Sequence, residues 1–449
     1  MDSVITSALR RTLDQLRVDE LAAFDARIPQ SRKWLDECRT LMPNGVPVAW
    51  MAGFWRHSPV VVESGQGTVF VDIDGNRYRD FNLCDLAMAA GFAPPAIVRA
   101  TIEQAQRGNH FLLPTRDARE VSLLLRDRFA LPAWQFTLSA SGANQDALRV
   151  ARAFTRRDRV VLFDAKYHGH LDEMLWTGDH PHGIGLPSGS GAHVTTVPFN
   201  DPEALDEALA PGDVAAVVLE PVMTNCGLVP PQPGFLAHVR AAASRHGTQV
   251  VADVTHTQFA VYGGGAHDDG LSPDIITGGK GIGGGVPVGV FGMTAGLAAF
   301  LTDHLEGDFV TEPSIPTGGT VYGSALSMAA ARAGLAEVFT PPAHEQVDTL
   351  GRELQHGLQR LVDEAGLGIT IDRWGGRCQW RLTEQQPVTG ADGYVSVDQG
   401  FADSRKLFFA NRGIWDAIAT SGPAISFAAT RDDVDAYLEV AQEFVGRLT

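Results

Sequence analysis

The sequence predicts an α/β fold, with a large domain built on a mainly parallel sheet flanked by helices and a smaller α+β domain. Two observations lead to this prediction. From about residue 135 to 295, short β-branched runs alternate with helical stretches, and such continuous apolar runs are typical of strands buried on both faces. After about residue 335 the pattern changes to helices separated by short strands, which indicates a separate domain.

The N-terminal segment is predicted to contain a docking helix and a small β element. Apolar residues recur at helical spacing near the start, at Val4, Ile5, Leu9, Leu13 and Leu16. Two short strands, 68–72 and 77–81, flank the turn signal Asp74-Gly75-Asn76. We therefore assign residues 1–80 to this segment.

The large domain is predicted to span residues 81–334. Its clearest strands are Val160–Phe163, Val217–Leu219, Val250–Ala252 and Ile275–Ile276. An amphipathic helix is expected after Ser141-Gly142, and its apolar stripe consists of Ala147, Leu148, Ala151 and Phe154. Residues 335–449, with helices near 350–365 and at 431–448, form the predicted small domain together with the N-terminal segment.

Composition narrows the classes of function. The chain has 449 residues and a formal net charge of −17, without a run of Lys and Arg, so nucleic acid is not an expected partner. Its four cysteines lie far apart, which indicates a reducing compartment and no cysteine-based metal site. No uncharged apolar run reaches the roughly 18 residues of a membrane span, and the N-terminus lacks the apolar core of a signal peptide. We expect a cytoplasmic protein without a membrane anchor or a metal ion.

A single lysine stands among glycines directly after an apolar run, in the segment Thr277-Gly-Gly-Lys280-Gly-Ile-Gly-Gly-Gly285. A lysine that forms a Schiff base needs clearance for a flat cofactor and backbone freedom for proton transfer, and glycines provide both. A surface lysine in a mobile loop is the alternative, because glycine-rich motifs are common. This segment alone does not decide between a Schiff-base lysine and a surface lysine at position 280.

An acid, Asp253, closes the apolar run that begins at Val250. Ligands of open α/β sheets bind at the carboxyl ends of the strands, so Asp253 is predicted to face that crevice. A buried carboxylate needs a partner, and a protonated pyridine nitrogen would supply one. A helix N-cap is the alternative role. The separation from Lys280 fits a βαβ unit that places both residues at one edge of the sheet.

The segment Phe136-Thr-Leu-Ser-Ala-Ser141-Gly142-Ala143-Asn144 leads from a strand through small residues into the amphipathic helix. Free amides at a helix start, with the helix dipole behind them, form a cup for phosphate. Ser141, Gly142 and Ala143 are the candidate residues of this cup. An ordinary capped helix start is the alternative.

In order and in sequence, these segments resemble the class III, fold-type I aminotransferases, which use pyridoxal 5′-phosphate (PLP), and most of all their glutamate-1-semialdehyde aminomutase branch. The resemblance runs from about Pro43 to the C-terminus. The family's lysine segment matches residues 279–289, which implies that Lys280 holds PLP and that Asp253 contacts the ring nitrogen. The family's aromatic-His-Gly turn matches Tyr167-His168-Gly169, which implies that Tyr167 stacks on the cofactor ring.

Two further segments carry implied roles. The segment Glu220–Phe235 resembles the Glu-Pro-Val segment of this branch and implies that Asn225 lies near the cofactor's 3′-oxygen. The segment Gly318–Ser324 resembles a stretch whose threonine reaches the phosphate in the other subunit. The resemblance thus implies a homodimer with shared active sites, in which Thr320 of one chain reaches the cofactor phosphate of the other. By sequence alone, Thr320 could equally be an ordinary turn residue.

The chain departs from the family pattern at two places in the site. Ser141-Gly142 stands where the family usually has Thr-Glu, so the family glutamate is missing from the cup. After Asp253 the family usually continues Glu-Val, whereas this chain continues Val254-Thr255-His256. Thr255 would replace the apolar residue packed behind the pyridine ring. His256 would stand near the cofactor edge, either as a packed core residue or as a catalytic or substrate-binding one.

The substrate side of the site is less defined. Candidate carboxylate clamps are Arg56, Arg377, Arg412 and Arg431, because arginine suits bidentate carboxylate recognition. The aromatic residues at the family's substrate entrance are Trp50, Phe54 and Trp55, for which packing of the N-terminal segment is the alternative.

The function expected is an aminotransferase with two half-reactions, which moves an amino group between an amino acid or amine and a keto acid or aldehyde. Lys280 would act as nucleophile and as general base. An aminomutase or amino-acid epimerase with the same cofactor site is the alternative. A non-catalytic binding protein with the same fold is a remote one, and an intact pair of Lys280 and Asp253 argues against it.

Overall fold

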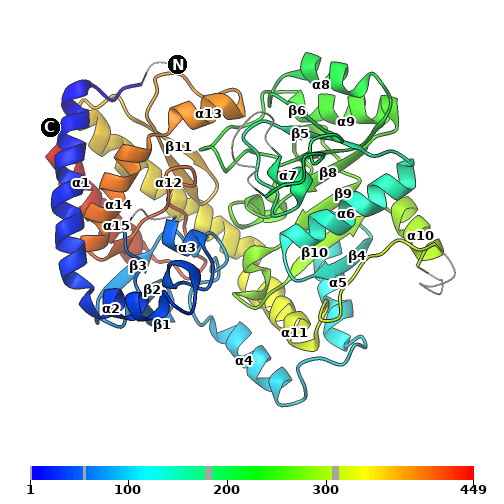
Figure 1. Cartoon of the computed structure of the whole chain (residues 1–449), viewed down its shortest axis with the longest axis horizontal. Helices are drawn as coiled ribbons and strands as arrows, with labels where there is room; N and C mark the ends of the chain where they lie inside the picture. Colours follow the sequence, from blue (N-terminus) through cyan, green and yellow to red (C-terminus); the bar gives the residue numbers. More distant parts are fainter. Residues whose placement is uncertain (1–2, 54–56, 177–184, 306–312) are drawn as a thin grey trace. The chain divides into compact units, whose positions relative to one another are not determined.

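The computed structural model describes residues 3–53, 57–176, 185–305 and 313–449. The chain divides into two compact units (Figure 1). Unit 1 combines residues 1–94, 345–386 and 394–449, and unit 2 combines residues 95–344 and 387–393. The predicted division after residues 80 and 334 stays a prediction, because compact units are defined by contacts and a domain by independent stability.

Unit 2 is built on a seven-stranded sheet with the order β4-β10-β9-β8-β7-β5-β6. Its strands are β4 (Ala133–Thr137), β5 (Arg159–Phe163), β6 (Val194–Val197), β7 (Val214–Leu219), β8 (Gln249–Asp253), β9 (Ile275–Gly278) and β10 (Gly289–Met293). All pairs from β9 to β6 are parallel, and β10 is antiparallel to both of its neighbours. The four predicted apolar runs are strands β5, β7, β8 and β9, so the mainly parallel sheet is confirmed.

Helices cover this sheet because its central strands are apolar on both faces and must be kept from water. All residues of β7, for example, are buried. Helix α6 (Ala140–Thr155) packs across β4, β7, β8, β9 and β10. The other helices of unit 2 are α4 (Pro95–Ala105), α5 (Arg116–Phe129), α7 (Asp172–Leu175), α8 (Pro202–Leu209), α9 (Phe235–His246), α10 (Ala295–Asp303) and α11 (Ala325–Ala333).

The predicted apolar stripe of α6 is mostly correct. Ala147, Leu148 and Ala151 are buried against the sheet, as expected. Phe154 is 41% exposed and is therefore not a core residue. Its ring instead packs edge-on against Phe300 of α10 at 5.2 Å.

Unit 1 contains a four-stranded mixed sheet and a two-stranded sheet. The strands are β1 (Val62–Gln66), β2 (Val69–Asp72), β3 (Arg77–Asp80), β11 (Thr370–Trp374), β12 (Arg377–Arg381) and β13 (Ile414–Trp415). The remaining helices are α1 (Ser7–Arg27), α2 (Pro29–Cys38), α3 (Trp50–Gly53), α12 (Pro341–Glu364), α13 (Gly390–Ser396), α14 (Gln399–Asn411) and α15 (Arg431–Leu448), of which α12 and α13 extend into unit 2. The predicted hairpin is β2-β3, and the predicted final helix is α15.

The predicted docking helix is α1, which packs on α14. Leu9 and Leu13 are buried in the core of unit 1, and Arg10 forms an ion pair with Asp398 in front of α14. Thr6 caps the helix by accepting a hydrogen bond from the amide of Leu9 (3.2 Å). Val4 and Ile5 precede the helix but still pack against the same core.

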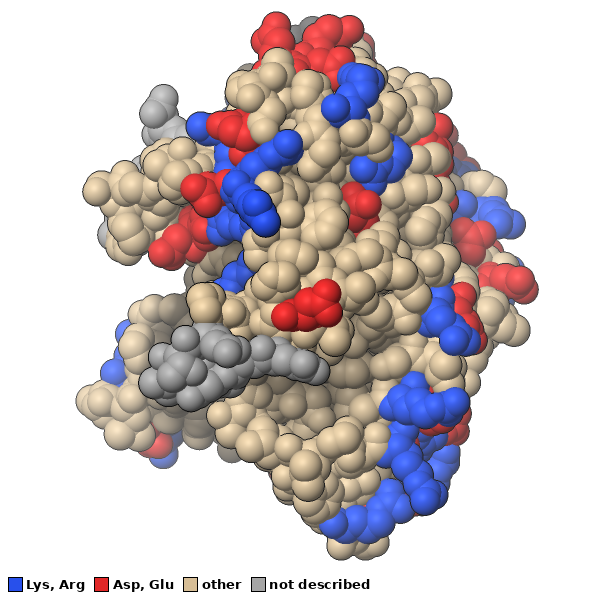
Figure 2. Space-filling model, turned by 90° about the vertical axis from the view of Figure 1, so that its right-hand side faces the viewer, with Lys and Arg blue, Asp and Glu red and all other residues tan. Residues whose placement is uncertain are grey.

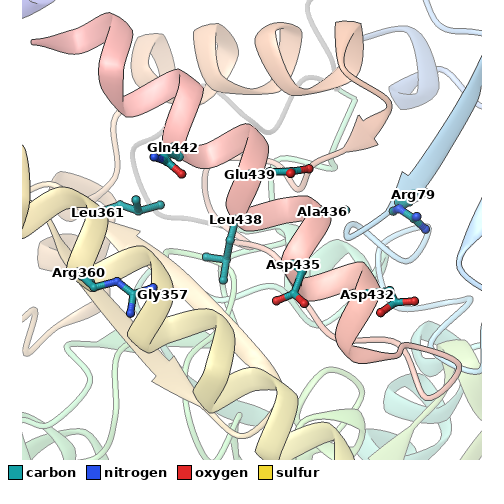
Figure 3. Close-up of a pocket in the computed structure, with 10 residues that line it drawn as sticks. All are labelled: Arg79, Gly357, Arg360, Leu361, Asp432, Asp435, Ala436, Leu438, Glu439 and Gln442. Atoms are coloured by element: carbon teal, nitrogen blue, oxygen red, sulfur yellow. The ribbon is translucent and has the colours of Figure 1, made fainter.

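Helices α12 and α15 meet through a glycine. A Cβ at Gly357 would lie 2.5 Å from Leu438 Cδ1, so a larger residue here would require the leucine side chain to move. Figure 3 shows Leu438 of α15 pointing toward α12, with charged side chains along the same groove. The groove encloses about 540 Å³ and its charged residues are Arg79, Arg360, Asp432, Asp435 and Glu439.

The surface carries charges of both signs. Figure 2 shows basic and acidic side chains beside one another at several places around one face, whose centre is mostly uncharged. In unit 2, oppositely charged surface residues form ion pairs such as Arg119–Glu120, Arg126–Asp127 and Arg159–Asp213. Among the described residues, no helix is long and apolar enough to cross a membrane, and no group of three His, Cys, Asp or Glu side chains is arranged to hold a metal ion.

Candidate active site

Strands β8 and β9 bring Asp253 and Lys280 to one edge of the sheet of unit 2. Asp253 ends β8 and is paired in register with Thr277 of β9, and Lys280 follows three residues later. Since the two strands are parallel, both residues lie at carboxyl ends, where ligands of open α/β sheets bind. The juxtaposition predicted from the spacing is therefore present in the structure.

Three groups hold the carboxylate of Asp253. His168 Nδ1 and Asn144 Nδ2 both lie 2.9 Å from Oδ2, and the amide of Thr255 donates to Oδ1 at 3.0 Å. Burial raises the pKa of Asp253, but the hydrogen bond and charge of His168, with the other bonds, outweigh it and lower the pKa to about 2. The carboxylate is ionised at neutral pH and retains acceptor capacity for one more donor.

Asp253 does not cap a helix. The short 3₁₀ helix that follows it spans Thr257–Phe259, and its N-cap residue is His256. The side chain of Asp253 is instead buried and points to groups from other segments of the chain. A buried carboxylate fixed in this way, at a strand end, is arranged for a cationic partner rather than for capping.

Lys280 is half-buried at the start of a 3₁₀ turn (Lys280–Gly283) and has a left-handed backbone, with φ of 57°. The loop before it is pressed against the start of α6, because a Cβ at Gly279 would lie 2.7 Å from the amide nitrogen of Ala140. Gln258 Nε2 also donates to the Gly279 carbonyl at 3.3 Å. The glycines therefore serve close packing between the lysine loop and the predicted phosphate cup.

The start of α6 forms part of a cavity of about 510 Å³. Ser139 is the N-cap: its hydroxyl accepts from the amide of Gly142 (3.2 Å), and its carbonyl accepts from Ala143 (3.0 Å). The amides of Ala140 and Ser141 precede this first helical bond. Residues that line the cavity include Ser139, Ser141, Gly142, His170 and Tyr322.

The Tyr167-His168-Gly169 turn lies directly on this helix start. A Cβ at Gly169, whose φ is +96°, would lie 2.2 Å from Ser141 Oγ, and the His170 amide donates to the same oxygen at 3.2 Å. Tyr167 is 41% exposed, and its ring meets that of His170 edge-on at 6.2 Å. The turn therefore couples the position of His168 on Asp253 to that of Ser141 in the cup.

Thr320 is exposed in a turn of unit 2. The segment before it is tied to α6, because the Gly318 amide donates to Asp146 Oδ2 (3.2 Å) and Arg149 Nη1 donates to the Pro316 carbonyl (3.1 Å). This tether fixes the loop at the helix that carries the cup.

A second buried cluster lies after β7 and contains Asn225. Glu220 follows that strand, accepts from Asn225 Nδ2 at 3.1 Å, and also accepts from the hydroxyl of Thr224. His256 Nδ1 lies 2.8 Å from Thr224 Oγ1, 3.2 Å from Asn225 Nδ2 and 3.6 Å from Glu220 Oε2. His256 is therefore part of a polar network and not a residue packed only in apolar surroundings.

Sequence reasoning missed several members of the site. It gave no role to His168, Asn144, Glu220 or Thr224, which hold the assigned residues in place. Asn144 offered a signal, because it occupies the same helical stripe as Ala147, Leu148 and Ala151 and is polar where the stripe is apolar. The aromatic-His-Gly turn includes His168 but does not predict its contact with Asp253, which joins residues 85 positions apart.

The candidate carboxylate clamps have structural partners in unit 1. Arg412 pairs with Glu20 (3.1 Å) and Glu443 (2.9 Å), and Arg431 lies near Glu353 at 3.7 Å on the surface. Arg377 is buried and donates to the Ser421 carbonyl at 2.6 Å. Trp50 is 45% exposed. Arg56, Phe54 and Trp55 lie outside the described residues.

Comparison with known proteins identifies the family. The family model described as aminotransferase class-III matches residues 52–407. The chain belongs to the class III aminotransferases. A relative named glutamate-1-semialdehyde 2,1-aminomutase, from Roseiflexus castenholzii, is 35% identical over 410 residues, which cover 87% of this chain and 91% of the relative. The class III aminotransferase family uses PLP, so the cofactor expected from the lysine segment is the cofactor of the family.

Solved structures of class III relatives share the fold of this chain. The crystal structure of a glutamate-1-semialdehyde aminomutase from Pseudomonas aeruginosa has a TM-score of 0.92 at 33% identity, covering 98% of this chain and 99% of that one. A second structure of that enzyme is a complex with PMP. A β-phenylalanine aminotransferase from Variovorax paradoxus has a TM-score of 0.86 at 27% identity, covering 97% of both chains. Fold type I is thereby confirmed.

Proposed function

We propose that this class III aminotransferase transfers an amino group between an amino acid or amine and a keto acid or aldehyde. The observation that carries the proposal is that an ionised, buried Asp253 and Lys280 lie at the ends of neighbouring parallel strands. Hydrogen bonds from His168, Asn144 and Thr255 already offset the burial of this carboxylate. Its remaining acceptor capacity, at the carboxyl end of a strand, suits a cationic ligand group.

The residues present fit PLP. Asp253 can accept from a protonated pyridine nitrogen, and the first amides of α6 can bind a phosphate. Gly169 and Gly279 allow the turn that carries His168 and the loop that carries Lys280 to pack closely on the start of α6. The residues proposed to contact the cofactor are Ser141, Gly142, Ala143, Tyr167, Asn225, Asp253, Thr255 and Lys280.

Each of these residues has a proposed task. PLP, when bound, supplies an electron sink that makes the substrate's Cα proton acidic. Asp253 would keep the pyridine nitrogen protonated, because its own pKa of about 2 leaves it ionised at neutral pH. Lys280 would hold the cofactor and then, once displaced by the incoming amine, move a proton at the substrate carbon with its Nζ.

A homodimer is part of the proposal. Thr320 is exposed on a loop tethered to α6, so its hydroxyl is available to a second copy of this chain. We propose that it completes the phosphate cup of that second copy, as the resemblance to the family implies. Each active site would then be built from two chains.

An internal amino transfer is the second candidate function. It is favoured by the 35% identity to a relative named glutamate-1-semialdehyde 2,1-aminomutase, whereas the structural likeness to a β-phenylalanine aminotransferase favours transfer between two molecules. An epimerase could use the same cofactor site. Turnover that requires an added keto-acid acceptor would identify an aminotransferase, and turnover of a single substrate without acceptor would identify a mutase or epimerase.

The test is to load the protein with PLP and to screen amine donors for conversion of the visible absorption band to that of pyridoxamine phosphate. Borohydride reduction and peptide mapping should label Lys280, and Lys280→Ala should abolish both label and turnover. Lys166 is the informative control, since burial lowers its pKa to about 8 while its Nζ donates to the carbonyls of Met174 (2.6 Å) and Trp176 (2.5 Å). Label on Lys166 would refute the assignment of Lys280.

A further inference from the structure

Two imidazole–carboxylate pairs lie on neighbouring strands of the sheet. His168 pairs with Asp253 at the end of β8, and His256 pairs with Glu220 just after β7. All four side chains are at least nine-tenths buried. The proposed function uses the first pair, but it gives no task to Glu220 and His256.

The hydrogens of the second cluster follow from donor and acceptor chemistry. Burial raises the pKa of Glu220, but the hydrogen bond and charge of His256 outweigh it and hold the pKa below its usual value, so Glu220 is an ionised acceptor. The hydroxyl of Thr224 must therefore donate to Glu220. The hydroxyl oxygen of Thr224 then accepts from His256 Nδ1 at 2.8 Å, which assigns a proton to Nδ1.

Glu220 also determines which way the amide of Asn225 faces. A carboxylate only accepts, so the amide nitrogen and not the oxygen must lie at the 3.1 Å contact with Glu220 Oε1. This contact uses one N–H of the amide. The second N–H cannot donate to His256 Nδ1, which lies 3.2 Å from Asn225 Nδ2, because that ring nitrogen carries a proton of its own. The second N–H is therefore left for another acceptor. Reciprocal backbone bonds between Met223 and Val229, both 3.1 Å, close the loop that carries Asn225.

The orientation of Asn225 depends on the charge of Glu220. A buried carboxylate is costly without a partner, and His256 supplies that partner. Without His256, Glu220 would take up a proton more readily. A protonated Glu220 could donate to the amide oxygen of Asn225, and the amide would then turn over.

We propose that His256 is a positioning residue that acts through Thr224 and Glu220 to hold the Asn225 amide in one orientation, with its second N–H available to the phenolic oxygen of the cofactor. The inference rests on the proposed function, because it takes the ligand to be PLP bound at Lys280. It assigns a task to a residue at which the chain departs from its family's usual pattern.

Three variants test this inference. His256→Met removes the imidazole at similar volume, Thr224→Val interrupts the relay, and His256→Asn keeps an amide N–H near the position of Nδ1. The readouts are the pH midpoint of the visible absorption band of the PLP-loaded protein and the affinity for PLP from a fluorescence titration. Thermal melting of each variant without PLP controls for folding.

The pH midpoint of the absorption band should rise by about one unit in His256→Met and Thr224→Val, and PLP affinity should fall about tenfold. The reason is that the phenolic oxygen of the cofactor loses its hydrogen bond from Asn225. His256→Asn should restore both readouts. An unchanged midpoint in His256→Met, or the same shift in His256→Asn, would overturn the inference. If His256→Met does not fold, Thr224→Val decides.

These outcomes are distinct from failure of the proposed function. A wild-type protein that takes up no PLP at Lys280 would refute the proposed function itself. A wild-type protein that loads PLP and turns over, beside a His256→Met variant with unchanged midpoint and affinity, would refute only the role of His256.

Discussion

His168 Nδ1 lies 2.9 Å from Asp253 Oδ2, and both side chains are almost completely buried. The backbone of His168 is fixed as well, because its carbonyl accepts from Asn144 Nδ2, which also bonds Asp253. Three side chains from three segments thus form one hydrogen-bonded cluster. The ionised state of Asp253 depends on this cluster and not on the aspartate alone.

Replacing His168 by Leu should raise the pKa of Asp253, because the carboxylate loses the hydrogen bond and charge that oppose its burial. A weaker partner for the pyridine nitrogen should lower PLP affinity and turnover, each by about tenfold, the equivalent of one charged hydrogen bond. Fluorescence titration with PLP and steady-state kinetics measure both. His193→Leu, at an exposed histidine of the same unit, is the matched control. Equal affinities in the two variants would contradict the prediction.

Gly169→Ala should disturb the phosphate cup. The residue has a φ of +96°, and its new Cβ would lie 2.2 Å from Ser141 Oγ and 2.9 Å from Ser141 Cα. Gly212→Ala is the matched control, since Gly212 has a φ of +73° and open space around it. Both variants should lose about 1 kcal/mol of unfolding free energy for the backbone conformation. Only Gly169→Ala should also weaken PLP binding, as measured by titration.

Thr320→Val should weaken PLP binding by about 1 to 3 kcal/mol, the contribution of a hydrogen bond to a charged group, while the dimer remains intact. The expected effect follows from the proposal that each cup is completed by a second copy of the chain. Thr317→Val, in the same loop, should leave the affinity unchanged. Gel filtration that finds an active monomer would refute the shared site.

Stability should fall in mild acid because of His57 in unit 1. Burial lowers the pKa of His57 to about 4, with a smaller contribution from the charge of Lys406, while the Ser58 carbonyl opposes the shift. Because the unfolded imidazole titrates near its ordinary pKa of about 6.5, the unfolded state binds more protons between these values. The stabilising contribution is complete above about pH 6.5 and decreases as the pH falls toward 4.

Chemical denaturation should therefore give an unfolding free energy about 2 kcal/mol lower at pH 5 than at pH 7.5 from this residue alone. His57→Phe should remove that part of the pH dependence. His193→Phe should leave it in place, because His193 is exposed. The same slope in wild type and His57→Phe would show that other groups are responsible.

The sequence was sufficient for the parts of the fold and site that follow from local patterns. Apolar runs predicted the strands, and the position of Asp253 and Lys280 directly after two of them predicted that they meet at one edge. Long-range side-chain contacts were beyond such patterns. Asn144 and Asp253 are 109 positions apart, and only the assembled sheet brings them together.

Departures from the family pattern are visible in the sequence, but the roles of these residues depend on contacts with distant parts of the chain. His256 could have been a core residue or a functional one, and the decision depended on its distances to Thr224 and Glu220. Helical spacing also predicts a buried Phe154, but this residue is 41% exposed and its ring packs against Phe300 of α10.

The strand order has a consequence for how a newly made chain acquires its cofactor. β10 is inserted between β4 and β9, so the first strand of the sheet in sequence pairs with the last. Such distant pairings form late, after the chain between them has been ordered. During synthesis the sheet cannot close until residue 293 has left the ribosome, and Gly289 of that last strand packs directly on Ser139 at the helix start. We therefore expect cofactor loading to follow completion of the large sheet.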